Sequence, residues 1–482
     1  MTSQRDTPKL YSPSWVLAMA IGSTIGWGSF VLPFDWVQQS GWAGAGIGFL
    51  LGGGAILVIA FNYSCVIEAI PVSGGSVAYA LASAGRKHAA VAGSSLALGY
   101  GSIVALNASA IPLIYRTILP GDNFGVYLYT VAGWDVYLLD VFVSSLFLVV
   151  FAVVAGRGAK TSGMFQTLAV STMLVAVLVL FILSITKFES IQNAASLPFP
   201  DGEKPLAAVA AIFAIAPWAF VGFDSIPQIA GELSFSPKKV RKLLVLGILC
   251  AASFYIAMIW IIAICTGDNF KRFEGSVWAS AEAVSYSLGP IGKWLMILAV
   301  TAGVLTGLIG FYTASSRVVQ TMSRAQILPP KFGEQDGRFH APRNALFLIM
   351  AICLITPWLG RASLSWIVDM ASVGITVSYF YTSLCATKIG FKGRVLGMAV
   401  PRSQDSWLVL SGGAGCVLSI AFLLLLVMPG APGQLSRESF IALAVWAVVA
   451  AIIFLIRKDA IMNAPINKLE RDVFFPDTTA RA

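Results

Sequence analysis

Charged side chains are scarce in this sequence of 482 residues, because only 11% of them are Asp, Glu, Lys or Arg. A soluble globular protein carries about 25% charged residues. Hydrophobic residues make up 57% of the chain, and the mean hydropathy is +0.81. The shortage of charge excludes an ordinary soluble fold and indicates a polytopic membrane protein.

Histidine and paired cysteine are also nearly missing. The sequence has two histidines and six cysteines, and no two cysteines form a Cys-x-x-Cys pair. We therefore expect no disulfide framework, no metal site and no cofactor. No histidine, cysteine or carboxylate pair has catalytic spacing, so the chain is not expected to be an enzyme.

Long polar segments are lacking as well, so no loop can hold a folded soluble domain. The whole chain, residues 1–482, is expected to form one domain in the lipid bilayer. It contains about twelve apolar stretches that are long enough to cross a membrane. They lie at residues 15–37, 43–70, 89–115, 136–155, 162–186, 206–230, 242–266, 286–320, 343–359, 364–386, 407–428 and 439–456.

The distribution of Lys and Arg predicts which loops face the cytoplasm. If both termini are cytoplasmic, most of the 32 Lys and Arg residues fall in inside loops, as the positive-inside rule requires. The net charge of +9 is then a topology signal, and no nucleic-acid partner is expected. We predict a multi-pass protein of the plasma (inner) membrane. The sequence carries no signal for an oligomeric state.

Two of the apolar spans are interrupted in their own middle. The first reads Gly-Ser-Thr-Ile-Gly-Trp-Gly-Ser at residues 22–29, and the second contains Pro217 and Gly222 within residues 216–225. Such stretches are poor helix formers. Within a membrane, a helix breaks only where protein or a water-filled cavity satisfies the freed backbone groups. Paired interruptions predict the binding site of a secondary transporter.

The two broken spans each open a block of five spans. The blocks cover residues 15–186 and 206–386, and two accessory spans follow at 407–456. Because five is odd, the second block enters the membrane from the opposite side. This is the geometry of an inverted repeat.

Four groups of motifs resemble the amino acid–polyamine–organocation permeases over nearly the whole chain. They are Gly22–Phe30 in the first span; Glu68 and Pro71–Tyr79 after the second; Phe220–Asp224, Gly231-Glu232 and Pro237–Val240 around the sixth; and Ser316-Arg317, Met322–Arg324 and Leu328-Pro329 at the end of the eighth. The resemblance implies an all-α fold of twelve transmembrane helices with a five-plus-five inverted repeat (LeuT-like) and broken helices 1 and 6. The sixth span is similar to that of the arginine/agmatine antiporter.

The first break is the predicted substrate site. Its unpaired backbone N–H groups suit a carboxylate, whereas tight packing through small residues is the competing interpretation. We predict that the substrate contacts Ser23, Thr24, Ile25, Gly26, Trp27 and Gly28. Trp27 departs from the family pattern, which often has a small residue there, so it either narrows the site or points into a neighbouring span. Asn107 in the third span either faces the site or bonds another helix.

The second break supplies the remaining predicted contacts. Carbonyl groups near Gly222 suit a substrate amino group, and Trp218 offers an aromatic face to a cation or an aliphatic stem. The resemblance adds Phe311 as a second aromatic gate. Asp224 is an ionisable group inside an apolar span, which indicates function. We interpret it as a proton-linked gate, and the alternatives are a partner for a substrate amine and a member of a structural network. Glu232 is predicted to contribute to coupling or gating by pairing with Arg317 or Arg324.

The coupling ion is left open. Some proton-coupled relatives carry a lysine in the middle of span 5, and here the matching place, around Val170 and Ser171, holds none. A sodium site would use paired hydroxyls on span 8, whose Thr301 and Thr306 are not adjacent. We predict a secondary active transporter of amino acids or related organic amines that works by proton symport or exchange. The alternatives are a sodium-coupled symporter and a transport-inactive amino-acid sensor of the same fold.

Overall fold

The computed structural model describes residues 10–119, 125–131, 134–187, 191, 198–200, 202, 204–360, 363–392, 394–395, 398–399, 405–431 and 433–474. Within these residues, nine helices are long and apolar enough to cross a membrane. They are Pro33–Ala69 (α3), Arg86–Ile118 (α5, Arg86–Ser109, and α6, Ile111–Ile118), Leu138–Ala155 (α7), Ala159–Ile185 (α8), Pro237–Thr266 (η3, Pro237–Lys239, and α12, Val240–Thr266), Ala279–Arg324 (α14), Trp366–Lys392 (in α16, Ser363–Lys392), Ser406–Val427 (α17) and Arg437–Asn463 (α18). The expected all-α membrane character is confirmed.

Shorter helical pieces occupy the three remaining predicted spans. The first span consists of α1 (Pro13–Thr24) and α2 (Gly28–Val31). The sixth contains α10 (Pro205–Ala214), α11 (Ala216–Ala219) and the 3-10 helices η1 (Phe223–Gln228) and η2 (Ala230–Glu232), and the ninth contains α15 (Arg343–Cys353) and η5 (Thr356–Leu359). The first and sixth spans are therefore broken near the glycines that the sequence singles out.

Two helix boundaries differ from the sequence prediction. Helix α3 joins the end of the first predicted span to the second, with a kink at Gly41, whose φ is 66°. A side chain there would place its Cβ 2.3 Å from the carbonyl oxygen of Pro198, so the kink requires glycine. Helix α14 runs from Ala279 to Arg324, longer than the predicted 286–320, and bends at Gly289.

Strands and short helices complete the described residues. A hairpin of β1 (Tyr127–Val131) and β2 (Trp134–Tyr137) follows α6, and β3 (Arg394–Val395) pairs with β4 (Met398–Ala399). Neither strand pair was predicted from the sequence. The remaining elements are α4 (Gly75–Ala84), α13 (Phe270–Phe273), η4 (Pro330–Gly333), α19 (Ile466–Leu469) and the π-helix Glu470–Phe474.

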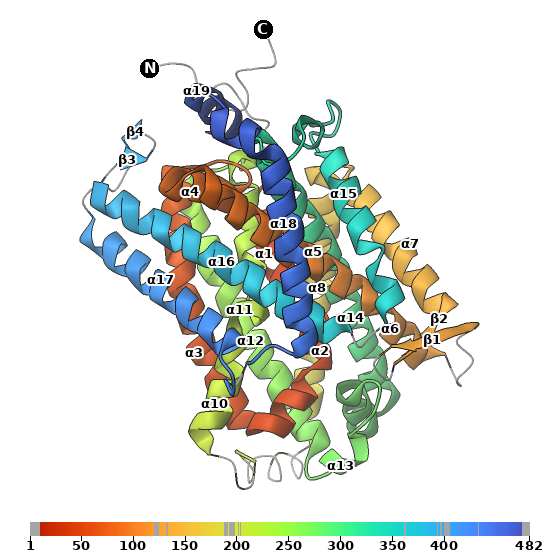
Figure 1. Cartoon of the computed structure of the whole chain (residues 1–482). Helices are drawn as coiled ribbons and strands as arrows, with labels where there is room; N and C mark the ends of the chain where they lie inside the picture. The colour runs from red at the N-terminus through yellow and green to blue at the C-terminus, as the bar shows by residue number, and fades with distance from the viewer. Residues whose placement is uncertain are drawn as a thin grey trace.

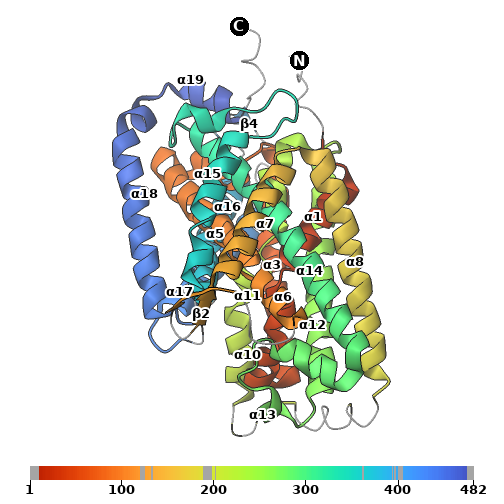
Figure 2. The ribbon, with the colours of Figure 1, turned by 90° about the vertical axis from the view of Figure 1, so that its right-hand side faces the viewer.

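Helix α1 lies in the interior of the molecule, and α18 lies at its edge. Helix α1 packs against α8, α12, α14 and η1, which places both breaks in one central region. In Figure 2, α18 stands at the left edge of the molecule, and it packs against α16. Large exposed hydrophobic side chains along α18, such as Val445, Ile452 and Leu455, suit a lipid-facing surface.

Candidate functional site

The first break leaves backbone groups free in the middle of the protein. Helix α1 ends at Thr24, and the N–H of Ile25 still bonds to the carbonyl of Ile21. Helix α2 begins at Gly28. Within the part of the chain that the structure describes, no acceptor pairs with the N–H groups of Gly26 and Trp27. Two donors are thus available to an anion.

The second break touches the first. Gly222 separates α11 from η1 with φ 123°, a conformation that side-chain-bearing residues rarely adopt. A Cβ at this position would lie 2.4 Å from the carbonyl carbon of Ser23 and 2.4 Å from the nitrogen of Thr24. Only glycine therefore allows the two interrupted spans to meet backbone to backbone.

A small cavity lies at this meeting point. It has about 30 Å³ of room for water-sized molecules, enough for about one or two waters, so a larger molecule would enter only after the site opens. Its lining residues are Ser23, Thr24, Gly26, Trp27, Gly28, Ser29, Ile103, Leu106, Asn107, Trp218, Ala219, Val221 and Tyr255. No Asp, Glu, Lys or Arg is among them, so the cavity presents dipoles and aromatic rings but no formal charge.

Several polar atoms at this central cavity are buried and unpaired. Within the described residues, the Ser23 and Thr24 hydroxyl oxygens and Asn107 Oδ1 have no hydrogen-bond partner. Buried polar atoms without partners are rare in native proteins and call for a ligand or water. Asn107 therefore faces the cavity, which is one of the two orientations expected for it. Its Nδ2 also donates to the carbonyl of Ile103 in its own helix.

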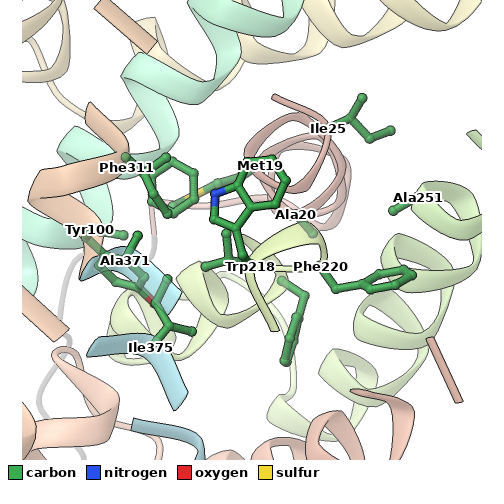
Figure 3. Packing of buried hydrophobic residues seen from close by; sticks show 14 of the residues in the cluster. Met19, Ala20, Ile25, Tyr100, Trp218, Phe220, Ala251, Phe311, Ala371 and Ile375 are labelled. Carbon is green, nitrogen blue, oxygen red and sulfur yellow. The ribbon is translucent and has the colours of Figure 1, made fainter. Parts of the chain in front are cut away.

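Trp218 lies against the glycine that begins α2. A Cβ at Gly28 would be 2.5 Å from Trp218 Cη2, so the absence of a side chain makes room for the indole. The side chain of Trp218 is 9% exposed and lines the central cavity. In the view of Figure 3 its indole lies between Phe311 and Tyr100 on one side and Phe220 on the other.

Tyr255 joins the two breaks and was missed by the sequence analysis. Its hydroxyl donates to the carbonyl of Thr24 at 3.2 Å and also to the carbonyl of Ala219. Both carbonyls are freed where a helix ends. The sequence could not identify Tyr255, because a single tyrosine in an apolar span is not distinctive. Only the contacts between helices show which carbonyls its hydroxyl bonds.

Three predicted substrate contacts do not line the central cavity. Ile25 is fully buried in the apolar core, and Gly222 is used in the contact between the breaks. Phe311 is 1% exposed and packs its ring 5.4 Å from that of Tyr100. For these three residues, contact with a substrate stays a prediction that would require the site to rearrange.

Asp224 is buried beside the cavity and bonded within the protein. Its Oδ1 accepts from the backbone N–H of Gly222 at 2.8 Å, and its Oδ2 accepts from the Tyr100 hydroxyl at 2.8 Å. Gln228 Nε2 donates to the backbone carbonyl of Asp224 at 3.1 Å. Neither carboxylate oxygen reaches the central cavity, so Asp224 is not placed to bind a substrate amine there.

Glu232 pairs with Arg317, one of the two partners that the sequence predicts. Arg317 Nε lies 2.6 Å from Glu232 Oε1, and both side chains are at most 4% exposed. Arg317 also donates to the carbonyl of His340 at 3.1 Å. The backbone N–H groups of Leu10 and Tyr11 donate to the carbonyl of Glu232, so the pair ties the start of the described chain to the end of span 6 and to α14.

A buried amide, Gln166, lies one turn before Val170, the place at which a coupling lysine was looked for in the sequence. Gln166 of α8 donates through Nε2 to the carbonyl of Thr306 at 3.2 Å, and the Thr306 hydroxyl donates to the carbonyl of Gly22 at 2.9 Å. A Cβ at Gly22 would lie 2.7 Å from both Gln166 Nε2 and Val170 Cγ2. Gln166 was not predicted as a functional residue from the sequence, although an amide in an apolar span, one turn before Val170, was a usable signal.

Among the residues that the structure describes, no three His, Cys, Asp or Glu side chains cluster closely enough to hold a metal ion. The six cysteines are all free thiols. The polar groups of the central cavity are therefore backbone dipoles, hydroxyls and an amide. Groups of this kind can hydrogen-bond a small polar molecule, and none of the cavity's side chains pairs a nucleophile with an adjacent base.

Comparison with known proteins places the chain among transporters. Residues 12–454 match the family described as amino acid permease. The branched-chain amino acid permease BcaP of Lactococcus lactis is 23% identical over 382 residues, covering 76% of this chain and 79% of that protein. The methylthioribose transporter of Bacillus subtilis is 24% identical over 365 residues, covering 74% and 76%. The lysine-specific permease LysP of Escherichia coli is 24% identical over 394 residues, covering 75% and 76%.

Proposed function

The chain belongs to the amino acid permease family, within the amino acid–polyamine–organocation superfamily, and we propose that it is a secondary active amino acid transporter. It works by alternating access around the breaks of spans 1 and 6. It crosses the plasma membrane twelve times with both termini cytoplasmic. Residues 15–186 and 206–386 form the inverted repeat, and residues 407–456 form two accessory helices.

The observation that carries the proposal is the meeting of both breaks at one cavity. The N–H groups of Gly26 and Trp27 and the hydroxyls of Ser23 and Thr24 are unpaired there. These donors would hold the substrate carboxylate. The indole of Trp218 borders the same space and would cover the bound molecule.

The substrate that this lining favours is a neutral amino acid with a small or apolar side chain. The central cavity has no charged side chain, and its apolar wall includes Ile103, Leu106 and Val221. Burying an unpaired cationic side chain against such a wall would be costly. The relative named as a branched-chain permease fits this assignment. A cationic amino acid is the second candidate, because another relative is named as lysine-specific.

Proton-linked gating through Asp224 is the proposed means of coupling. The Asp224 carboxylate holds the N–H of Gly222 at one oxygen and Tyr100 at the other, so its charge state acts on the backbone of the second break. Protonation would remove the charge from these bonds and loosen the contact between spans 3 and 6.

Uptake into proteoliposomes tests the proposal. Radiolabelled leucine, alanine, lysine and putrescine would be supplied with a pH gradient, a sodium gradient or internal substrate. We expect saturable leucine or alanine uptake that a pH gradient or internal substrate drives. Trp218→Ala should abolish it, whereas Trp42→Ala, a tryptophan that packs on Trp260 away from the cavity, should keep it. Asp224→Asn should retain binding and lose the response to pH.

Each competing assignment gives a different result. Uptake that needs a sodium gradient would establish the sodium-coupled symporter instead. Substrate binding without flux under every gradient would identify a sensor. Preference for lysine over leucine would overturn the neutral substrate while leaving the transporter in place.

A further inference from the structure

A second cavity lies next to the central one, under the β1–β2 hairpin. It has about 30 Å³ of room for water-sized molecules, and its wall includes Leu113 of α6, Trp134 and Val136 of β2, Asp140 of α7 and Pro357 of η5. In Figures 1 and 2, the hairpin lies toward the end of the molecule that carries α13 and away from α19. This outer cavity is thus on the side predicted to face outward.

Trp27 belongs to the walls of both cavities. Its side chain is only 5% exposed, and it borders the central cavity and the outer cavity alike. Within the described residues, its Nε1 has no acceptor although the atom is buried. A buried indole N–H usually finds a partner, so this ring is held between two spaces without a bond that fixes it.

The charged groups at the outer cavity are already engaged. Asp140 accepts from Arg116, from the Tyr115 hydroxyl and from the N–H of Tyr137. The Arg116 guanidinium lies 5.0 Å from the ring centroids of both Trp134 and Tyr137. The Arg116–Asp140 ion pair and the two rings hold the outer wall in place. The rest of the lining presents mostly apolar surface to a molecule that enters.

We propose that Trp27 is the partition between an outer approach cavity and the central site. When its indole swings aside, the two spaces join into one route, by which a neutral amino acid would reach the central site. The outer cavity would receive the apolar side chain of that molecule first. The size of the partition would then limit which substrates pass. The substrate part of this inference rests on the proposed function, whereas the partition itself does not.

Cysteine accessibility tests the partition without measuring transport. Leu106 lines the central cavity and is 1% exposed, so Leu106→Cys reports on solvent access there. A membrane-impermeant thiosulfonate would be added to right-side-out vesicles, with the wild-type chain and its six cysteines as background. Adding Trp27→Ala should speed the labelling of Leu106→Cys about tenfold or more, because a minor open state is populated to about 10% or less.

Matched variants separate a partition from general loosening. Trp134→Ala removes a tryptophan from the outer cavity alone and should leave the labelling slow. Trp27→Phe keeps a ring in place and should also label slowly. If Trp27→Ala unfolds in detergent, Trp27→Leu preserves apolar packing without the ring and should label fast.

Three results would overturn the inference. The first is fast labelling of Leu106→Cys with Trp27 present. The second is slow labelling in both Trp27→Ala and Trp27→Leu, and the third is equal acceleration by Trp134→Ala. None of these results depends on uptake, so a failed partition is distinct from a failed transporter assignment. If transport is found, Trp27→Ala should also admit neutral amino acids larger than those that the wild type carries.

Discussion

Gly28 and Gly222 show how single missing side chains shape the site. At Gly28 the space holds the ring of Trp218, and at Gly222 it holds the backbone of Ser23 and Thr24. The cluster of glycines in the first span had two interpretations, a ligand site or tight packing. The structure shows the tight packing directly, and the same close approach of the two spans borders the central cavity. The two interpretations are therefore compatible, and contact with a ligand stays a prediction.

Gly28→Ala should weaken substrate binding. The new methyl group would lie 2.5 Å from Trp218 Cη2 and push the indole out of place. Overpacking of this kind costs about 1–3 kcal/mol; if the cost falls on the bound state, it corresponds to a rise in Kd of about 5-fold to 150-fold. Binding of radiolabelled substrate to purified protein measures the change.

Gly46→Ala is the control for that substitution. Nothing lies within 4 Å of a Cβ at Gly46 on α3, so affinity should be unchanged, and helix propensity favours alanine by up to about 1 kcal/mol. Equal affinity in the Gly28→Ala protein and the wild type would contradict the position that we assign to the indole.

At the scale of elements, the interior is held by a few polar contacts between helices. Thr306 of α14 bonds to Gly22 of α1, and Gln166 of α8 bonds to Thr306. The Glu232–Arg317 pair joins the end of span 6 to α14. These contacts fix the helices around the breaks, and the ion pair does so with charges that are almost fully removed from solvent.

Arg317→Ala should destabilise the protein strongly. It leaves the Glu232 carboxylate buried without its cation, and breaking a buried pair in this way costs about 3–5 kcal/mol. Arg343→Ala is the matched control, because its pair with Asp336 is 3.0 Å long but the arginine side chain is 43% exposed. Exposed pairs contribute about 0–1 kcal/mol.

Thermal unfolding in detergent would measure both variants. A large loss for Arg317→Ala with little change for Arg343→Ala is expected. Similar unfolding temperatures for the two variants would show that the buried pair contributes no more to stability than the exposed pair.

At the scale of the whole molecule, loops predicted to share one side of the membrane do lie together. Arg86, at the start of α5, donates to the carbonyls of Ile461 and Ala464 near the end of α18, and Arg457 donates to the carbonyl of Gln326 after α14. On the other side, Gln38 donates to Glu274 at 3.4 Å. The contacts agree with the sidedness inferred from Lys and Arg.

Labelling of single cysteines tests that sidedness. Glu274→Cys near α13 and Glu334→Cys after η4 both replace exposed side chains. An impermeant thiol reagent should modify Glu274→Cys only in right-side-out vesicles and Glu334→Cys only in inside-out vesicles. Modification of both from one face would refute the proposed topology.

The sequence by itself determined the class of protein and the location of the breaks. Low charge and long apolar runs require a membrane protein, since few other environments tolerate that composition. Glycine and proline mark the interruptions because their backbone effects are local. The motifs then led to the permease family, which the match over residues 12–454 confirms.

Only the tertiary structure decided which side chains share the central cavity. Of the predicted substrate contacts, Ser23, Thr24, Gly26, Trp27, Gly28 and Trp218 line it, whereas Ile25, Gly222 and Phe311 do not. Tyr255 joins the two breaks although it lies more than thirty positions in sequence from each of the residues that it bonds. Gln166 of α8 likewise bonds to a residue of α14. Local propensity specifies where a helix ends, but side-chain contacts between spans depend on how helices rotate and pack. That packing alone placed Trp27 between two cavities.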